Sequence, residues 1–427
     1  MRILMLLFGL CLSSRAATYY LSASGGNDAN NGTSSGTPWK TIIHAQTNVV
    51  ANDTLLFNRG ETFYSTGTGQ AVWTNTVNGL TLDAYGSGAL PILDGAFTNR
   101  WIVIWLTTSN GSVNNLYLRN AGTNAGSNTG SIVQTDASGT NSITGCVMDY
   151  HTIDDGVARN NGWLMVTNCQ IINCADQGFT MHGTDGGGLI VSGCTVSNCL
   201  EAFKNSCTGL TLKVLDTVMT DNGTGDVDAL DGCVGTFERC WFKGKTTTGS
   251  YAFIKACTQP VTMDYCLFDA TRITANVANP QITLDSATIM NNCVIYGNGN
   301  GNMNVDAGGT LVMTNSIISS WWRAAFITAP GTLTLDHCIT NAITTGTQTV
   351  NVNKIAGDPL FVAPNSGDFH LQSGSPAIGT GLNLGYTLDL ADNPVANPPD
   401  LGVYQFLFPK TTVFTNAINI NGAVTIK

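Results

Sequence analysis

The chain has 427 residues, of which only 11% carry a charge, whereas about 25% do in an average soluble domain. With 28 acidic and 18 basic residues the formal net charge is −10, which excludes nucleic acid and anionic membrane surfaces as favourable partners. The apolar fraction of 43% is sufficient for a large core.

Residues 1–16 have the pattern of a secretory signal peptide. Arg2 precedes the apolar run 3–12, and Ser14 and Ala16 fit the small-x-small cleavage rule. The alternative is a buried N-terminal helix, because the run is too short to span a membrane. We predict a secreted protein, either extracellular, periplasmic or at the cell surface, without membrane insertion. Its mature chain would keep 16 basic and 28 acidic residues, a net charge of −12.

A sequence repeat with a period of 22 to 27 residues runs through the middle of the chain. One position of each repeat holds a small side chain, and these positions are Cys146, Cys169, Cys194, Thr217, Cys240, Cys266, Cys293, Ser316 and Cys338. Each unit alternates apolar and polar residues as strands do, and Gly and Asn mark the turns. Because such units bury their apolar faces only by stacking on each other, the period predicts an all-β parallel β-helix with one coil per repeat.

The repeated cysteines are predicted to stack as a ladder in the core, about 4.8 Å apart. Disulfide bonds are one alternative, because 12 of the 13 cysteines remain after Cys11 leaves with the signal peptide. Stacked side chains point the same way, however, and do not provide the dihedral of about 90° that a disulfide needs. We therefore expect small buried thiols, and metal binding is disfavoured because no Cys-x-x-Cys pair occurs.

Breaks in the repeat divide the chain into five segments. They are the signal peptide (1–16), an N-terminal cap with the first coils (17–95), the β-helix coils (96–345), a C-terminal coil and cap (346–406) and a tail (407–427). The tail alternates like an extra strand, so we expect it to seal the C-terminal end or to pair with a partner. We predict one domain and a monomer.

The two ends of the mature chain carry motifs of a known superfamily. The opening motif Tyr-x-Ser-x-x-Gly, followed by Asp, consists of Tyr20, Ser22, Gly25 and Asp28. The closing motifs are Asp-Pro-x-Phe at 358–361 and Ser-Pro-Ala-Ile at 375–378. Together with the coils, they resemble secreted bacterial right-handed β-helix proteins of the pectate lyase-like superfamily. This resemblance implies a right-handed parallel β-helix, and the superfamily contains polysaccharide lyases, glycoside hydrolases, epimerases and proteins with no assigned activity.

Charged residues gather after the cysteine-bearing strands of the early coils. The apolar residues aligned between coils are Val157, Phe179, Phe203, Leu230 and Phe253. Two positions before them stand Asp155, Gln177, Glu201, Asp228 and Tyr251, with Asp154, Asp176 and Asp226 nearby. Just beyond them lies a second strip that contains Arg159, His182, Lys204, Asp231 and Lys255. A strip of this kind on a solenoid predicts a lateral groove for an extended polysaccharide.

Two reactions would suit this groove. In a lyase, carboxylates bind Ca²⁺ and a base removes the proton next to a uronate carboxylate. The candidate metal ligands are Asp154, Asp155, Asp176, Glu201, Asp228 and Asp231, and the candidate bases or charge partners are Arg159, His182, Lys204 and Lys255. The stretch DQGFTMH (176–182) resembles the Asp-x-Gly-Phe-x-x-Lys stretch of some calcium-dependent β-helix pectate lyases, with His182 in place of the lysine.

In a hydrolase, two carboxyl groups would flank the scissile bond, and adjacent coils supply a suitable separation. Glu201 with Asp228 would serve, and so would Asp155 with Asp176 or with Glu201. Tyr251, Trp321 and Trp322 are candidates for stacking on sugar rings. The alternatives are acids that only cap turns, and a non-catalytic glycan-binding or structural rod.

Overall fold

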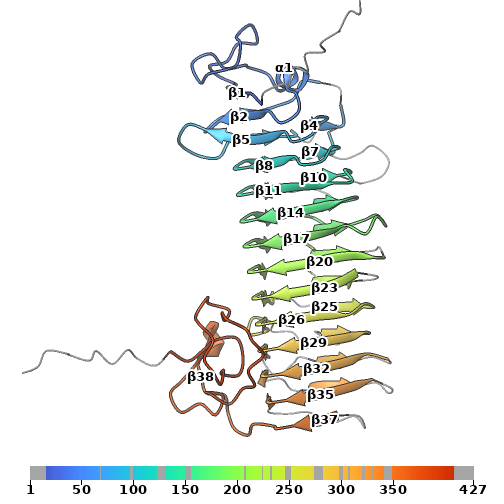
Figure 1. The fold of residues 1–427 in the computed structure, drawn as a ribbon, viewed down its shortest axis with the longest axis vertical. Helices are drawn as coiled ribbons and strands as arrows, with labels where there is room; N and C mark the ends of the chain where they lie inside the picture. The colour runs from blue at the N-terminus through green and yellow to red at the C-terminus, as the bar shows by residue number, and fades with distance from the viewer. Residues whose placement is uncertain are drawn as a thin grey trace, which may run out of the picture.

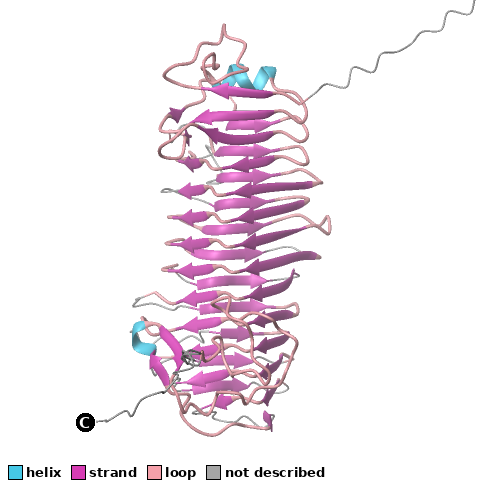
Figure 2. Ribbon diagram, turned by 60° about the vertical axis from the view of Figure 1, so that its left-hand side comes forward, coloured by secondary structure: helices cyan, strands magenta, loops and turns pink. Residues whose placement is uncertain are grey.

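The chain forms a long rod of stacked coils (Figure 1). Its structure is a computed structural model that describes residues 16–67, 69–96, 100–122, 130–149, 155–205, 208–223, 225–230, 233–245, 252–273, 282–297, 302–305, 308–319, 323–327, 331–340 and 349–407. Within these residues, all strands except one C-terminal hairpin belong to three parallel sheets that run along the rod (Figure 2). This is the right-handed parallel β-helix that the sequence predicts.

Each coil contributes one strand to each sheet, in the order A, B, C. Among the described residues, sheet A has 14 strands: β1 (Thr18–Leu21), β2 (Thr54–Asn58), β5 (Thr81–Tyr85), β8 (Ser112–Asn114), β11 (Thr140–Thr144), β14 (Trp163–Thr167), β17 (Gly188–Ser192), β20 (Leu210–Leu215), β23 (Cys233–Glu238), β26 (Val261–Asp264), β29 (Ala287–Asn291), β32 (Thr310–Thr314), β35 (Thr332–Asp336) and β37 (Thr349–Val352). Sheet B, counted in the same way, has 12: β3 (Thr62–Phe63), β6 (Ile92–Asp94), β9 (Tyr117–Arg119), β12 (Val147–Asp149), β15 (Gln170–Ile172), β18 (Thr195–Ser197), β21 (Val218–Thr220), β24 (Trp241–Lys243), β27 (Leu267–Asp269), β30 (Val294–Tyr296), β33 (Ile317–Ser319) and β36 (Ile339–Thr340).

Sheet C carries the residues of interest for function. Its 11 strands in the described part are β4 (Ala71–Asn75), β7 (Ile102–Leu106), β10 (Ser131–Thr135), β13 (Asp155–Arg159), β16 (Gln177–Met181), β19 (Glu201–Asn205), β22 (Gly225–Leu230), β25 (Ala252–Cys257), β28 (Ile282–Leu284), β31 (Asn302–Val305) and β34 (Arg323–Ile327). The C-terminal hairpin consists of β38 (Phe361–Ala363) and β39 (Asp368–Leu371), joined by a 3-10 turn at Pro364–Ser366.

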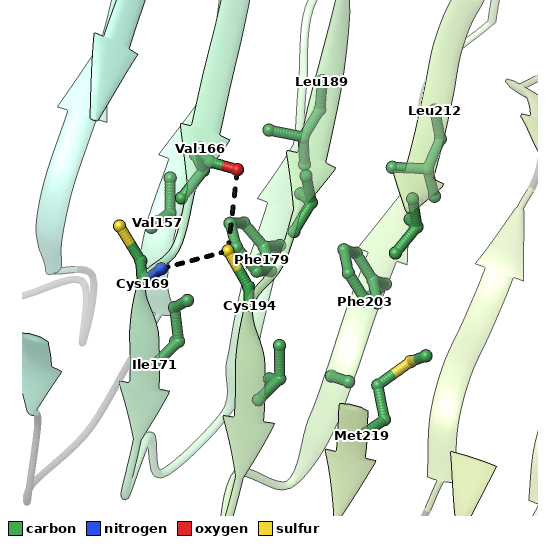
Figure 3. Packing of buried hydrophobic residues seen from close by; sticks show 14 of the residues in the cluster. Val157, Val166, Cys169, Ile171, Phe179, Leu189, Cys194, Phe203, Leu212 and Met219 are labelled. Atoms are coloured by element: carbon green, nitrogen blue, oxygen red, sulfur yellow. Dashed lines mark hydrogen bonds between the residues drawn. The ribbon is translucent and has the colours of Figure 1, made fainter. Parts of the chain in front are cut away.

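The cysteine ladder lies inside the rod, as predicted. Cys169 and Cys194 stack on neighbouring coils, and the backbone N–H of Cys169 donates to Sγ of Cys194 over 3.4 Å (Figure 3). The backbone N–H of Cys194 donates in turn to the hydroxyl of Thr217, which takes the same place in the next coil. All ten described cysteines are buried free thiols, as expected, and seven of them take the repeated position.

A left-handed residue stands at the turn between sheets A and B of most coils. Its φ is +52° at Asn168 and +63° at Gly193, and equivalent residues precede the other cysteine positions. Asn and Gly tolerate this conformation best, which explains the recurring Asn-Cys and Gly-Cys pairs. Four coils depart from the rule, with Asp216, Arg239, Tyr265 and His337 at φ values near +50°.

Helix α1 (Ile42–Asn48) lies over the N-terminal end of the rod (Figure 1). The side chain of Thr41 caps it by accepting from the backbone N–H of His44, and Ile42 and Ala45 are buried. Among the described residues, no helix has the length and apolar content needed to cross a bilayer.

The C-terminal segment folds back along the side of the last coils (Figure 1). Phe361, Phe369 and Leu401 pack there against a row of outward side chains of sheet B. That row is apolar at Leu267, Val294, Ile317 and Ile339, whereas the earlier coils mix Val147 and Val218 with Gln170 and Thr195 at the equivalent place. The row is therefore uniformly apolar where the segment covers it.

Candidate functional site

The candidate site lies on the outer face of sheet C in the early coils. The first residues of its strands are aligned, with Ser131 opposite Asp155 and Gln177 opposite Glu201. The second residue of each strand faces inward: a Cβ added at Gly156 would collide with core side chains. The first and fourth residues of β10, β13 and β16 point outward, where they line one hollow.

A hollow of about 420 Å³ opens over these outward residues. It is lined by Trp101, Gly130, Ser131, Gln134, Asp155, Ala158, Asn160, Asp176, Gln177, Thr180, His182 and Lys204. Four of the predicted site residues are thus brought to one hollow: Asp155, Asp176, His182 and Lys204. The hollow lies on the coils at which the lateral groove is predicted.

Two carboxylates of the site share one amide donor. The side-chain amide of Gln177 donates to Asp176 and, over 3.0 Å, to Oε2 of Glu201. The two acceptor oxygens are therefore no more than two hydrogen-bond lengths apart, about 6 Å. Glu201 and Asp155 are buried, with 6% and 8% of their surface exposed, so three carboxylates lie on successive coils with little water around two of them.

Lys204 is the cation that the structure brings to these carboxylates. Its Nζ lies 3.7 Å from Oε2 of Glu201, and 39% of its side chain is exposed. In the strand register it is opposite Thr180 on one side and Asp228 on the other. Glu201 does not itself line the hollow but contacts two residues that do, Gln177 and Lys204.

His182 lies at the other edge of the hollow. Asp176 precedes β16 and His182 follows it, so a five-residue strand of roughly 17 Å separates them. Burial lowers the pKa of His182, which keeps its imidazole neutral at neutral pH. His182 is therefore available as a base, but it does not belong to the carboxylate group.

The prediction that Arg159 acts on a ligand in the groove is wrong. Arg159 is the fifth residue of β13, points inward and is fully buried. Its guanidinium donates to the carbonyls of Gly162 and His182 and to the carboxylate of Asp185. Arg159 thus holds the loop that follows His182 and has no access to the hollow.

The predicted alignment of Asp228 with Glu201 is also wrong. Gly225 is opposite Glu201, and Asp228 is opposite Lys204. The reason is that Val227, and not Leu230, is opposite Phe203, so that Asp228 lies three positions beyond the residue opposite Glu201. Lys255 is opposite Asp228 in the next strand.

Several predicted residues lie outside the described part of the chain. They are Asp154, Asp231, Tyr251, Trp321 and Trp322. Asp226, by contrast, is fully buried and accepts from the side-chain amide of Asn222, so it belongs to the core. Calcium binding stays a prediction: the described residues contain no group of three metal-binding side chains arranged around one point, and the amide of Gln177 occupies the space between Asp176 and Glu201.

The sequence analysis missed the N-terminal wall of the hollow, which contains Trp101, Gln134 and Asn160. Trp101 and Gln134 belong to the two coils before that of Cys146, and the cysteine position is held there by Pro91 and Leu116. An alignment that accepted these residues at this position would have extended the repeat to Trp101.

Comparison with solved structures shows the same architecture in several proteins. The chain is similar to pectate lyase Pel9A, with a TM-score of 0.53 and 15% identity over 92% of this chain and 97% of that one. It is also similar to a rhamnogalacturonan lyase (TM-score 0.38, 13% identity, 81% of this chain and 91% of that one) and to an alginate lyase from Paenibacillus sp. str. FPU-7 (TM-score 0.40, 14% identity, 80% and 99%). No family model matches the sequence, and no curated protein matches it. At these identities the likeness concerns the fold alone, and the chain has a right-handed parallel β-helix.

Proposed function

We propose that this protein cleaves a polysaccharide that lies in the hollow over β10, β13, β16 and β19. One observation carries the proposal: Asp155, Asp176 and Lys204 line a single lateral hollow, in a chain where only 11% of residues are charged. Glu201 connects them through its contacts with Gln177 and Lys204. Titratable groups of both signs at a concave site are typical of catalytic centres.

The chemistry that we favour is β-elimination on a uronate-containing glycan. This reaction needs a cation that neutralises the uronate carboxylate and a base that accepts the neighbouring proton. Lys204 is the basic residue closest to the carboxylates and is therefore our candidate for either role. The similarity to Pel9A, whose description is pectate lyase, agrees with this choice but establishes only the fold.

Hydrolysis is the second candidate, and the shared amide of Gln177 favours it. Two carboxyl groups about 5 to 5.5 Å apart are typical of retaining glycosidases. The oxygens of Asp176 and Glu201 that accept from the same nitrogen are no more than about 6 Å apart, which is compatible with this range. In this case one of them would act as nucleophile and the other as acid and base.

Export is part of the proposal, because a polymeric glycan is met outside the cell. It rests on the signal-peptide pattern of residues 1–16. Mass spectrometry of the protein recovered from the medium or periplasm of an expressing bacterium would test it, and a mature N-terminus at Ala17 is the expected result.

The activity test is a panel of polyuronates and neutral polysaccharides, each incubated with added calcium and with chelator. Ultraviolet absorbance from an unsaturated product would establish elimination, and its loss with chelator would establish a metal requirement. Reducing ends without absorbance would establish hydrolysis. Neither signal from the folded protein on the whole panel would contradict the proposal and favour a glycan-binding or structural rod.

A further inference from the structure

The hollow has an aromatic end that the reaction proposed above does not use. Trp101 stands directly before β7, is half-buried and lines the hollow. The backbone N–H of Ser131 donates to the carbonyl of Trp101 over 2.7 Å, and that of Asp155 donates to Gly130 over 3.2 Å. Trp101 and Gly130 therefore take equivalent places on successive coils.

The carboxylates lie at the other end of this row. Asp176 takes the same place two coils beyond Gly130, so its Cα is three strand spacings from that of Trp101, about 14 Å. Gly130, next to Trp101 in this row, has no side chain and lines the hollow too. The geometry combines an aromatic wall and an acidic end along the axis of the rod.

The aromatic wall is held in place by its neighbours. The rings of Trp101 and Trp105 are 6.3 Å apart, and the indole N–H of Trp105 donates to Asp136. Asp136 also accepts from Gln134 over 3.0 Å and from Asn160 over 2.6 Å. Gln134 and Asn160 line the hollow too, so the carboxylate of Asp136 orients the Trp105 ring and both amide side chains. Because these side chains are already held in place, little conformational entropy is lost when a ligand binds.

We propose that Trp101 forms a sugar-binding subsite on which a pyranose ring of the glycan stacks. The apolar C–H face of a pyranose fits an indole face, while its hydroxyl groups need polar partners of the kind that Gln134 and Asn160 supply. The subsite rests on the proposed function and adds a direction to it: the glycan lies along the rod, with one sugar at Trp101 and the scissile bond at the carboxylates. Trp101 is a binding residue and not a catalytic one.

The test compares the affinities of short and long oligosaccharides. Calorimetry would use oligogalacturonates and xylo-oligosaccharides of two to six residues, with all proteins carrying Glu201→Gln to prevent turnover. The parent protein, which carries Glu201→Gln alone, should bind the longer members of one series more tightly than the dimer. Adding Trp101→Leu should weaken the binding of these longer members about three- to tenfold. Trp101→Phe should retain most of the parent's affinity, which guards against a folding defect in the leucine variant.

Trp163 offers a matched control. It is also half-exposed, but it lies on sheet A and away from the hollow, so Trp163→Leu should bind like the parent. If folded Trp101→Leu binds every length like the parent, the subsite is refuted while the proposed function stands. If the parent binds no member of either series, both the subsite and glycan cleavage in this hollow are contradicted.

Discussion

At the scale of single residues, basic side chains play opposite roles on the two faces of sheet C. Lys204 is the fourth residue of its strand and points outward to Glu201, whereas Arg159 is the fifth of its strand and is fully buried. Both follow an aligned apolar residue closely in the sequence, so the prediction placed them in one strip. The structure separates them because successive strand residues point to opposite faces.

The ion pair between Arg159 and Asp185 leads to a prediction about the pH dependence of stability. Burial by itself would raise the pKa of Asp185, but hydrogen bonds from the backbone of Gly162 and from Arg159 outweigh it and lower this pKa. A lowered folded-state pKa stabilises the protein above the ordinary aspartate pKa, and this contribution is lost as the pH falls through the folded-state value. We expect Asp185→Asn to lower the free energy of unfolding by about 1 to 2 kcal/mol at pH 7 and by less below pH about 4.

Urea unfolding of both proteins between pH 7 and pH 2.5 would measure this difference. Asp216→Asn is a suitable control, because Asp216 pairs with Arg239 near the surface and should matter less. Parallel stability curves for the wild type and Asp185→Asn would rule out the proposed contribution of the ionised carboxylate.

At the scale of elements, the left-handed turn between sheets A and B is the recurring conformational constraint. His337 adopts φ +49° there, in a place where Asn and Gly dominate. A left-handed non-glycine residue costs about 1 to 2 kcal/mol, and Asn bears this cost best among the non-glycine residues. We therefore predict that His337→Asn raises the free energy of unfolding by about 0.5 to 1 kcal/mol.

The control is His337→Ala, which removes the contact between His337 and Asp336 without relieving the turn. Chemical denaturation would place the alanine variant below the wild type and the asparagine variant above it. Equal stability of the two variants would show that the conformation of this turn does not affect the free energy of unfolding.

The fold and part of the site followed from sequence periodicity, and the remainder depended on local irregularities. The cysteine ladder fixed the coils, and the spacing after it placed Asp155, Asp176 and Lys204 in one hollow. Val227, and not Leu230, is opposite Phe203, which takes Asp228 out of the row of Glu201; the sequence could not distinguish the two registers because both place an apolar residue opposite Phe203. Trp101 was missed because its coil has Pro91 in place of cysteine.

At the scale of the whole molecule, the covered and open surfaces lie on different coils. The C-terminal segment contacts the coils from β24 onward, through the apolar row of sheet B and through the hydrogen bond from Tyr386 to Asp264. The hollow lies on earlier coils and on sheet C, so this segment leaves it open. A long, open and concave face on a rigid solenoid is suited to an extended polymer.

The most direct test of the central claim is cleavage by Glu201→Gln compared with Asp216→Asn on whichever polysaccharide of the panel the wild type degrades. Both variants remove one negative charge, but only Glu201 contacts Gln177 and Lys204 at the hollow. We predict that Glu201→Gln lowers kcat/KM by at least about 100-fold with its Tm unchanged, and that Asp216→Asn stays within about twofold of the wild type. A folded Glu201→Gln variant with wild-type activity would contradict a catalytic centre at this hollow.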